Sequence, residues 1–131
     1  MGLKVNTNME ALNAHNTLVN EALRPARFLH LHDGSGPVPT RLVNNLCVGP
    51  GVADGMLDNA LQGNFMAPIR ELRDAAAGLY MLAAASALRQ RGIEPGAAHG
   101  VSLRPHAEFA PPVGTRALPA PPRWSPGAYP S

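Results

Sequence analysis

Prolines limit how long any regular element of this chain can be. There are 14 prolines among 131 residues, and nine of them follow residue 94. Because proline fixes φ and lacks a backbone N–H, it interrupts helices and central strands alike. We therefore expect residues 93–131 to form a disordered tail with polyproline II character. Regular structure is expected only where prolines are sparse.

The first proline-free stretch, residues 6–23, is predicted to form a helix. Residues suitable as N-caps open it, apolar residues then recur at three- and four-residue steps, and Pro25 ends it near Leu23. The apolar stripe is narrow and interrupted. A helix of this kind needs a partner helix to be stable in water.

A second helix is predicted for residues 64–91. Pro68 suits an early helical position, Arg89 and Arg91 suit the last turn, and Gly92 suits the C-terminal stop. The expected chain is thus mostly α-helical with extensive irregular and disordered regions. Its expected parts are a helix in residues 1–23, an irregular Pro/Gly-rich segment in residues 24–63, an Ala-rich helix in residues 64–92 and a disordered tail in residues 93–131.

Charge and hydropathy exclude several classes of partner. The net charge is +2, and the excess lies in three dispersed tail arginines, which do not form a nucleic-acid-binding stripe. The most apolar stretch, residues 75–88, is too short to span a bilayer. The single Cys47 excludes an internal disulfide and a multi-cysteine metal site. We expect neither nucleic-acid binding nor a membrane span.

No catalytic, cofactor or metal site is predicted. His30-Leu31-His32-Asp33 has metal-ligand residue types, but no further ligand stands at an informative spacing. Residues 49–55 are glycine-rich, yet Pro50 removes an N–H that a phosphate cradle needs. No nucleophile, base and carboxylate can be placed in one site. The chain is therefore not expected to be an enzyme.

The most specific motif lies in the first 14 residues. Val5-Asn6-Thr7-Asn8 is followed, after three intervening residues, by Leu12-Asn13-Ala14. This spacing resembles the N-terminal segment of bacterial flagellins over about residues 1–23, and residues 74–79 carry a weaker echo. The resemblance implies a structural, self-assembling subunit of the flagellar filament, with its first helix in coiled-coil packing. It also implies other flagellin-type subunits and the flagellar export apparatus as partners, and an extracellular location; a chain that is not exported would stay cytoplasmic.

The resemblance places the assembly interface in this first segment. The residues implied are Val5, Asn6, Thr7, Asn8, Leu12, Asn13, Ala14, Leu18 and Val19. Later residues depart from the family pattern, which leaves two alternatives. One is a frameshift after Leu23, with no evolved function beyond it; this would explain the abundance of Ala, Gly, Pro and Arg. The other is a small helical adaptor that binds a partner protein through residues 64–91.

Overall fold

The chain is built from short β-strands. The computed structural model describes residues 3–5, 12–31, 41–53, 60–98 and 100–130. Within these ranges the strands are two to six residues long, and no helix reaches seven residues. The expectation of a mostly α-helical chain is therefore wrong.

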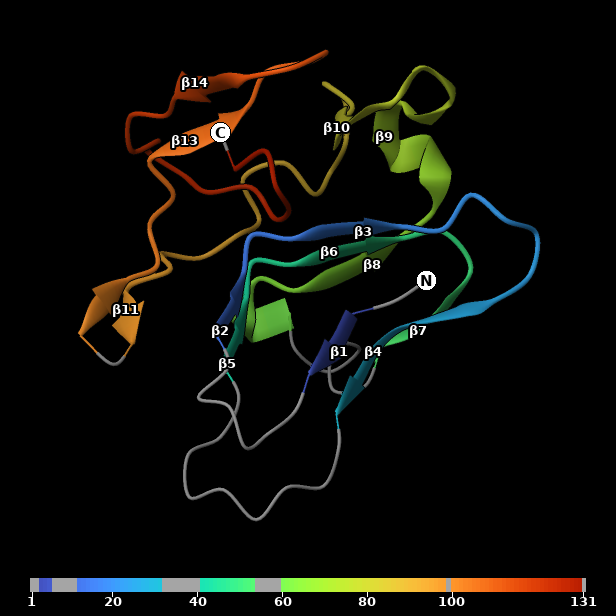
Figure 1. The fold of residues 1–131 in the computed structure, drawn as a ribbon, viewed down its shortest axis with the longest axis horizontal. Coiled ribbons are helices and arrows are strands. Elements are labelled where there is room, and N and C mark those ends of the chain that lie inside the picture. Colours follow the sequence, from blue (N-terminus) through green and yellow to red (C-terminus); the bar gives the residue numbers. More distant parts are fainter. Residues whose placement is uncertain (1–2, 6–11, 32–40, 54–59, 99, 131) are drawn as a thin grey trace.

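The described residues between 3 and 67 wind as three stacked turns, here called coils 1 to 3 (Figure 1). Coil 1 contains β1 (Leu3–Val5), β2 (Leu12–Ala14) and β3 (Thr17–Val19); coil 2 contains β4 (Ala26–Leu31), β5 (Arg41–Val43) and β6 (Leu46–Val48); coil 3 contains β7 (Gly51–Ala53), the 3-10 helix η1 (Ala60–Gln62) and β8 (Phe65–Ala67). Equivalent strands of successive coils pair in parallel, which gives the sheets β1-β4-β7, β2-β5 and β3-β6-β8. This is the arrangement of a parallel β-helix.

A polar ladder joins the three coils at the corner between their second and third sides. The corner residues His15, Asn44 and Gly63 have φ values of 55°, 55° and 74°. This left-handed conformation suits Asn, His and Gly better than other residues. An asparagine follows each of them: Asn16, Asn45 and Asn64.

The side chains of these three asparagines bond from coil to coil. Asn45 Oδ1 accepts hydrogen bonds from the backbone N and the Nδ2 of Asn16, at 3.0 and 2.9 Å. Asn64 Oδ1 accepts in the same way from the N and Nδ2 of Asn45, at 2.9 and 3.0 Å. The side-chain amide of Asn64, the last in the ladder, bonds back to coil 2: its Nδ2 donates to the Leu42 carbonyl at 2.9 Å. The ladder satisfies buried polar groups and fixes the register of the coils.

The predicted N-terminal helix is wrong in the part that the structure describes. β2, the corner at His15 and β3 occupy residues 12–19; the remainder of that prediction, residues 6–11, lies outside the described ranges. The Asn16 carbonyl accepts from Leu46 N at 2.8 Å, so it bonds to coil 2 rather than to its own segment. The narrow stripe does find a second surface, but that surface is a neighbouring strand.

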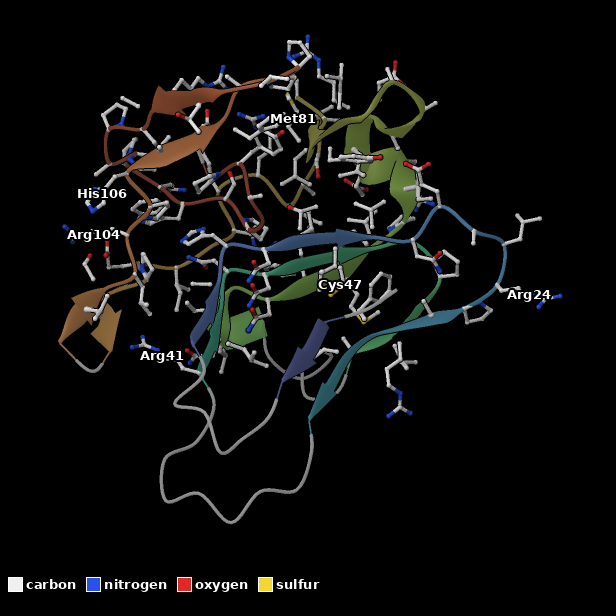
Figure 2. The ribbon with its side chains drawn as sticks, in the orientation of Figure 1. Arg24, Arg41, Cys47, Met81, Arg104 and His106 are labelled. Atoms are coloured by element: carbon white, nitrogen blue, oxygen red, sulfur yellow. The ribbon has the colours of Figure 1, made fainter. Side chains whose placement is uncertain are left out.

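Apolar side chains fill the space inside the coils. Leu18, Cys47 and Met66 occupy the same register position on β3, β6 and β8, and therefore form a column. They belong to a cluster with Phe28, Leu29, Leu42 and Ala53. Figure 2 shows Cys47 between the β3-β6-β8 sheet and the strands β4 and β7. Burial raises the pKa of the Cys47 thiol to about 12, so the residue behaves as an apolar group.

The outer face of the β3-β6-β8 sheet carries a second core. Side chains alternate along a strand, so Leu46 and Val48 point away from the column of Cys47. Their cover is the chain that follows coil 3, chiefly through Leu72 and Leu82, with Tyr80 and Leu88 packed against them.

The predicted helix over residues 64–91 is replaced by this cover. After β8 come the 3-10 helix η2 (Ile69–Glu71), β9 (Leu72–Asp74), the 3-10 helix η3 (Ala75–Ala77) and β10 (Leu79–Leu82), and β9 pairs antiparallel with β10. Gly78, at φ 75°, ends η3 and returns the chain, which a continuous helix cannot do. A flat sheet face needs a broad apolar cover, and the hairpin provides it.

The tail is ordered in the described residues, which corrects the expectation of disorder. It contains the hairpins β11 (Ala97–Ala98)–β12 (Val101–Ser102) and β13 (Ala107–Phe109)–β14 (Thr115–Ala117). Several of its prolines fill space rather than interrupt structure, since Pro95, Pro126 and Pro130 are almost fully buried. A buried proline leaves no N–H to satisfy.

Replacing the central asparagine of the ladder should destabilise the whole coil stack. Asn45→Ala removes the acceptor for two donors of Asn16 and the donor to Asn64 Oδ1 inside the fold. We expect a loss of about 2–4 kcal/mol in the free energy of unfolding, because buried groups lose their partners. Urea denaturation followed by circular dichroism measures it.

Asn20→Ala is the matched control for this measurement. Asn20 also makes several side-chain hydrogen bonds, to Arg24, Pro50 and Ala22, but at an exposed turn where water can replace them. Its expected cost is below about 1 kcal/mol. Equal losses in the two variants would contradict a stabilising role for the buried ladder.

Candidate assembly edge and its corner

Coil 1 has one side that faces away from the stack. Asn16 O accepts from Leu46 N, and Asn20 N donates to Val48 O, both at 2.8 Å. In a parallel strand, the N–H and C=O of one residue point to the same side, and alternate residues point to opposite sides. The backbone groups of Thr17 and Val19 therefore point away from coil 2. No described strand pairs with them, since β3 ends its sheet.

The ladder also ends at this edge. Asn16 donates to Asn45 through both its backbone N and its Nδ2. The Oδ1 of Asn16 is the equivalent of the Oδ1 atoms of Asn45 and Asn64, which accept hydrogen bonds. No described residue donates to the Oδ1 of Asn16. Coil 1 thus offers a side-chain acceptor beside the outward backbone groups of β3.

The interface residues implied by the flagellin resemblance all belong to the first segment, but they do not share one face. Val5 lies in β1, Leu12, Asn13 and Ala14 form β2, and Leu18 and Val19 lie in β3, whereas Asn6, Thr7 and Asn8 lie outside the described residues. Leu18 packs inside the coils, and Val19 packs on the outer face of the sheet. What these described residues have in common is that they all lie in coil 1.

The corner is covered by the last residues of the chain, here called the strap (residues 124–130). Gly127 N donates to Asn44 O and Ala128 N donates to Thr17 Oγ1, both at 2.8 Å. Gly127 has φ 94°, and a Cβ there would lie 2.5 Å from Thr17 Oγ1, so only glycine fits. The strap therefore bonds to both coil 1 and coil 2.

Asn44 ties a further segment to the same corner. Its Oδ1 accepts from Ile93 N and its Nδ2 donates to Ile93 O, each at 2.7 Å. Trp124 Nε1 donates to Glu94 Oε2 at 3.2 Å, and Glu94 pairs with Arg104 at 2.7 Å. Residues 93–94 and the strap thus close over the corner together.

His15 is the titratable residue enclosed at this corner. Its side chain is buried, with its ring centroid 5.3 Å from that of Trp124. Asn44 Nδ2 lies 3.2 Å from its Nε2, and because an amide nitrogen only donates, Nε2 accepts in the neutral ring. Burial lowers the pKa of His15 to about 4, with the Gly127 backbone and the charge of Glu94 opposing in part.

The other motifs of the sequence do not assemble a site. His30 lies in β4, while His32 and Asp33 are outside the described ranges. Gly49 and Pro50 form the bend between β6 and β7. Among the residues that the structure describes, no three His, Cys, Asp or Glu side chains gather as metal ligands. In the same ranges, no helix has the length and apolar character needed to cross a bilayer.

Sequence reasoning missed the residues that organise the corner, namely His15, Asn44, Asn45 and Asn64. The available signal was a threefold pattern of a corner residue, an asparagine and a short apolar strand, beginning at residues 15, 44 and 63. Comparison with known proteins adds nothing to this geometry: no family model matches the chain, and no significant similarity to a curated protein or a solved structure is found.

The buried histidine should make the fold sensitive to acid. The pKa of His15 is about 4 in the folded chain and about 6.5 when exposed, so below pH 6.5 the unfolded chain binds a proton that the folded chain does not. We expect the free energy of unfolding to fall between pH 6.5 and pH 4 and then to level off, by up to about 3 kcal/mol. Denaturant melts across this range measure it.

His15→Asn is the control, because Asn44 shows that asparagine fits the same corner conformation one coil further on. In this variant, the free energy of unfolding should no longer show the decrease between pH 6.5 and pH 4 that is due to residue 15. An unchanged pH profile in His15→Asn would show that the acid sensitivity has another source.

Proposed function

We propose that the chain is a structural, self-assembling subunit and that coil 1 is its assembly surface. The observation that carries the proposal is the outward edge of β3, where no strand among the described residues pairs with the backbone groups of Thr17 and Val19. An unpaired strand edge with a row of donors and acceptors is a template for a further strand.

The stacking inside the chain supports a second copy as the partner. Backbone bonds at the two ends of β3 recur one coil further on: Leu46 N to Asn16 O has its equivalent in Phe65 N to Asn45 O. Likewise, Asn20 N to Val48 O has its equivalent in Gly49 N to Ala67 O. This sequence thus forms strands that accept another strand of the same chain, and the edge of a second copy offers the same groups.

The flagellin resemblance gives this proposal a more specific form, in which the partners are flagellin-type subunits and the chain is exported to the flagellum. Its support is the motif in residues 5–14. The coiled-coil packing that the resemblance implied is not part of it, because β2 and β3 are strands.

The ladder argues against a frameshift after Leu23. The corner at His15 precedes Leu23, and the corners at Asn44 and Gly63 follow it. At each corner an asparagine precedes an apolar strand, and these strands pair in matching register. An unrelated reading frame would supply such a match only by chance. The adaptor alternative depended on a helix over residues 64–91, and that segment contains β8, β9 and β10.

Proline at the outward edge should block assembly without breaking the coil stack. Val19→Pro removes an outward N–H and places a ring where a second strand would approach, while the bonds of Asn16 and Asn20 to coil 2 remain. We expect the wild-type chain to form pairs and the association constant of the variant to fall at least about tenfold, which corresponds to about 1.4 kcal/mol. Sedimentation equilibrium measures both.

Leu23→Pro is the control for the proline itself, since Leu23 is fully exposed in the turn after coil 1. It should pair as the wild type does. The proposal is wrong if the wild-type chain stays monomeric at high concentration, or if wild type and Val19→Pro associate equally. Circular dichroism checks that each variant is folded.

The flagellin form of the proposal has a separate test. Residues 1–23 are grafted onto a flagellin that lacks its own first segment, either unchanged or with Leu12→Asp. We expect filaments with the native graft only, because Leu12 belongs to the interface that the resemblance implies, and a charge enclosed there without a partner would block packing. If neither graft restores filaments, or both do so equally, the flagellin form is wrong, whatever the result at the β3 edge.

A further inference from the structure

A cavity of about 460 Å³ lies outside the coils, between the β9–β10 hairpin, β14 and the strap. Three arginines, Arg73, Arg89 and Arg116, line it together with Met81 and Tyr129. Figure 2 shows Met81 between β10 and the β13–β14 hairpin. The arginines come from three separate segments, so the fold, and not a local run of charge, brings them together.

The charges around this cavity do not balance. Arg116 donates to Glu108 Oε1 through Nε and Nη2, each at 2.6 Å, so its charge is compensated by a buried carboxylate. Arg73 instead contacts the sulfur of Met81 at 3.8 Å. Neither Arg73 nor Arg89 pairs with a carboxylate in the described part of the chain. Two guanidinium groups at the cavity therefore carry charge that no described carboxylate compensates.

The rest of the lining favours a small organic ligand over free solvent ions. The volume lies in the range of small-molecule sites, and such sites combine apolar walls with a few polar groups that fix orientation. Leu82, Ala83 and Met81 supply the apolar wall, and Tyr129 supplies an aromatic ring with a hydroxyl. Guanidinium groups bind carboxylate, sulfate and phosphate oxygens with paired hydrogen bonds.

We propose that this cavity binds a small organic anion with two or more negative charges. Two free guanidinium groups match two anionic groups, whereas a single charge would leave one of them uncompensated. No lining residue belongs to the coils, although Ser125 and Tyr129 lie in the strap, which bonds to Thr17 of coil 1.

Isothermal titration calorimetry on the full chain tests the proposal, with citrate and inorganic pyrophosphate as divalent or higher anions and acetate as the monovalent comparison. We expect citrate, pyrophosphate or both to bind, and acetate to bind at least tenfold more weakly. Binding of citrate alone assigns the site to carboxylates, and binding of pyrophosphate alone assigns it to phosphates.

The variant is Arg73→Gln with Arg89→Gln, which leaves the Arg116–Glu108 pair intact. Its matched control is Arg24→Gln with Arg70→Gln, two exposed arginines outside the cavity that change the net charge equally; Arg24 lies at the turn after coil 1, far from Met81 in Figure 2. The cavity variant should lose at least tenfold in affinity, and the control should lose less than twofold. Equal losses, or no binding of either polyvalent anion to the wild type, would overturn the proposal.

Discussion

The corner at His15, Asn44 and Gly63 is the constraint on which the rest of this structure depends. Each residue adopts a left-handed conformation that turns the strand, and the asparagine after it bonds to the next coil. The sequence separation between corners differs: it is 29 from Asn16 to Asn45 and 19 from Asn45 to Asn64. The corner therefore sets the register even though the spacing between corners differs.

Both apolar cores follow from that register. Because the corner aligns β3, β6 and β8, Leu18, Cys47 and Met66 form a column inside, and Val19, Val48 and Ala67 present a face outside. The outer face then requires a cover, which η2, β9 and β10 provide. The strap depends on the corner directly, since the Asn44 carbonyl and the Thr17 hydroxyl hold its backbone.

The sequence permitted part of this to be predicted. The need of the first segment for a second surface was readable, although the partner helix expected there was wrong, because β3 pairs with β6 instead. The fold class was not readable, because strands of three residues are too short to show alternation, and the same residues also fit a helical stripe. The unequal spacing of the corners hides the repeat from a search for a fixed period. Prolines were misread because burial, as at Pro95 and Pro126, depends on partners distant in sequence.

The direction of the ladder decides what kind of assembly the edge supports. Asn16 and Asn45 each donate to the asparagine of the next coil, so the Oδ1 of Asn16 remains as an acceptor at the open side of coil 1. Asn64 is buried, and its Nδ2 donates back to Leu42 O. Gly63 is also covered, since a Cβ there would lie 3.1 Å from Ile93 N. Head-to-tail stacking would have to displace these contacts, whereas on the outward side of β3 no described strand pairs with Thr17 and Val19. Under the assembly proposal made above, the open edge of coil 1 therefore suits a two-fold pair of subunits, and a filament would need a second surface elsewhere on the subunit.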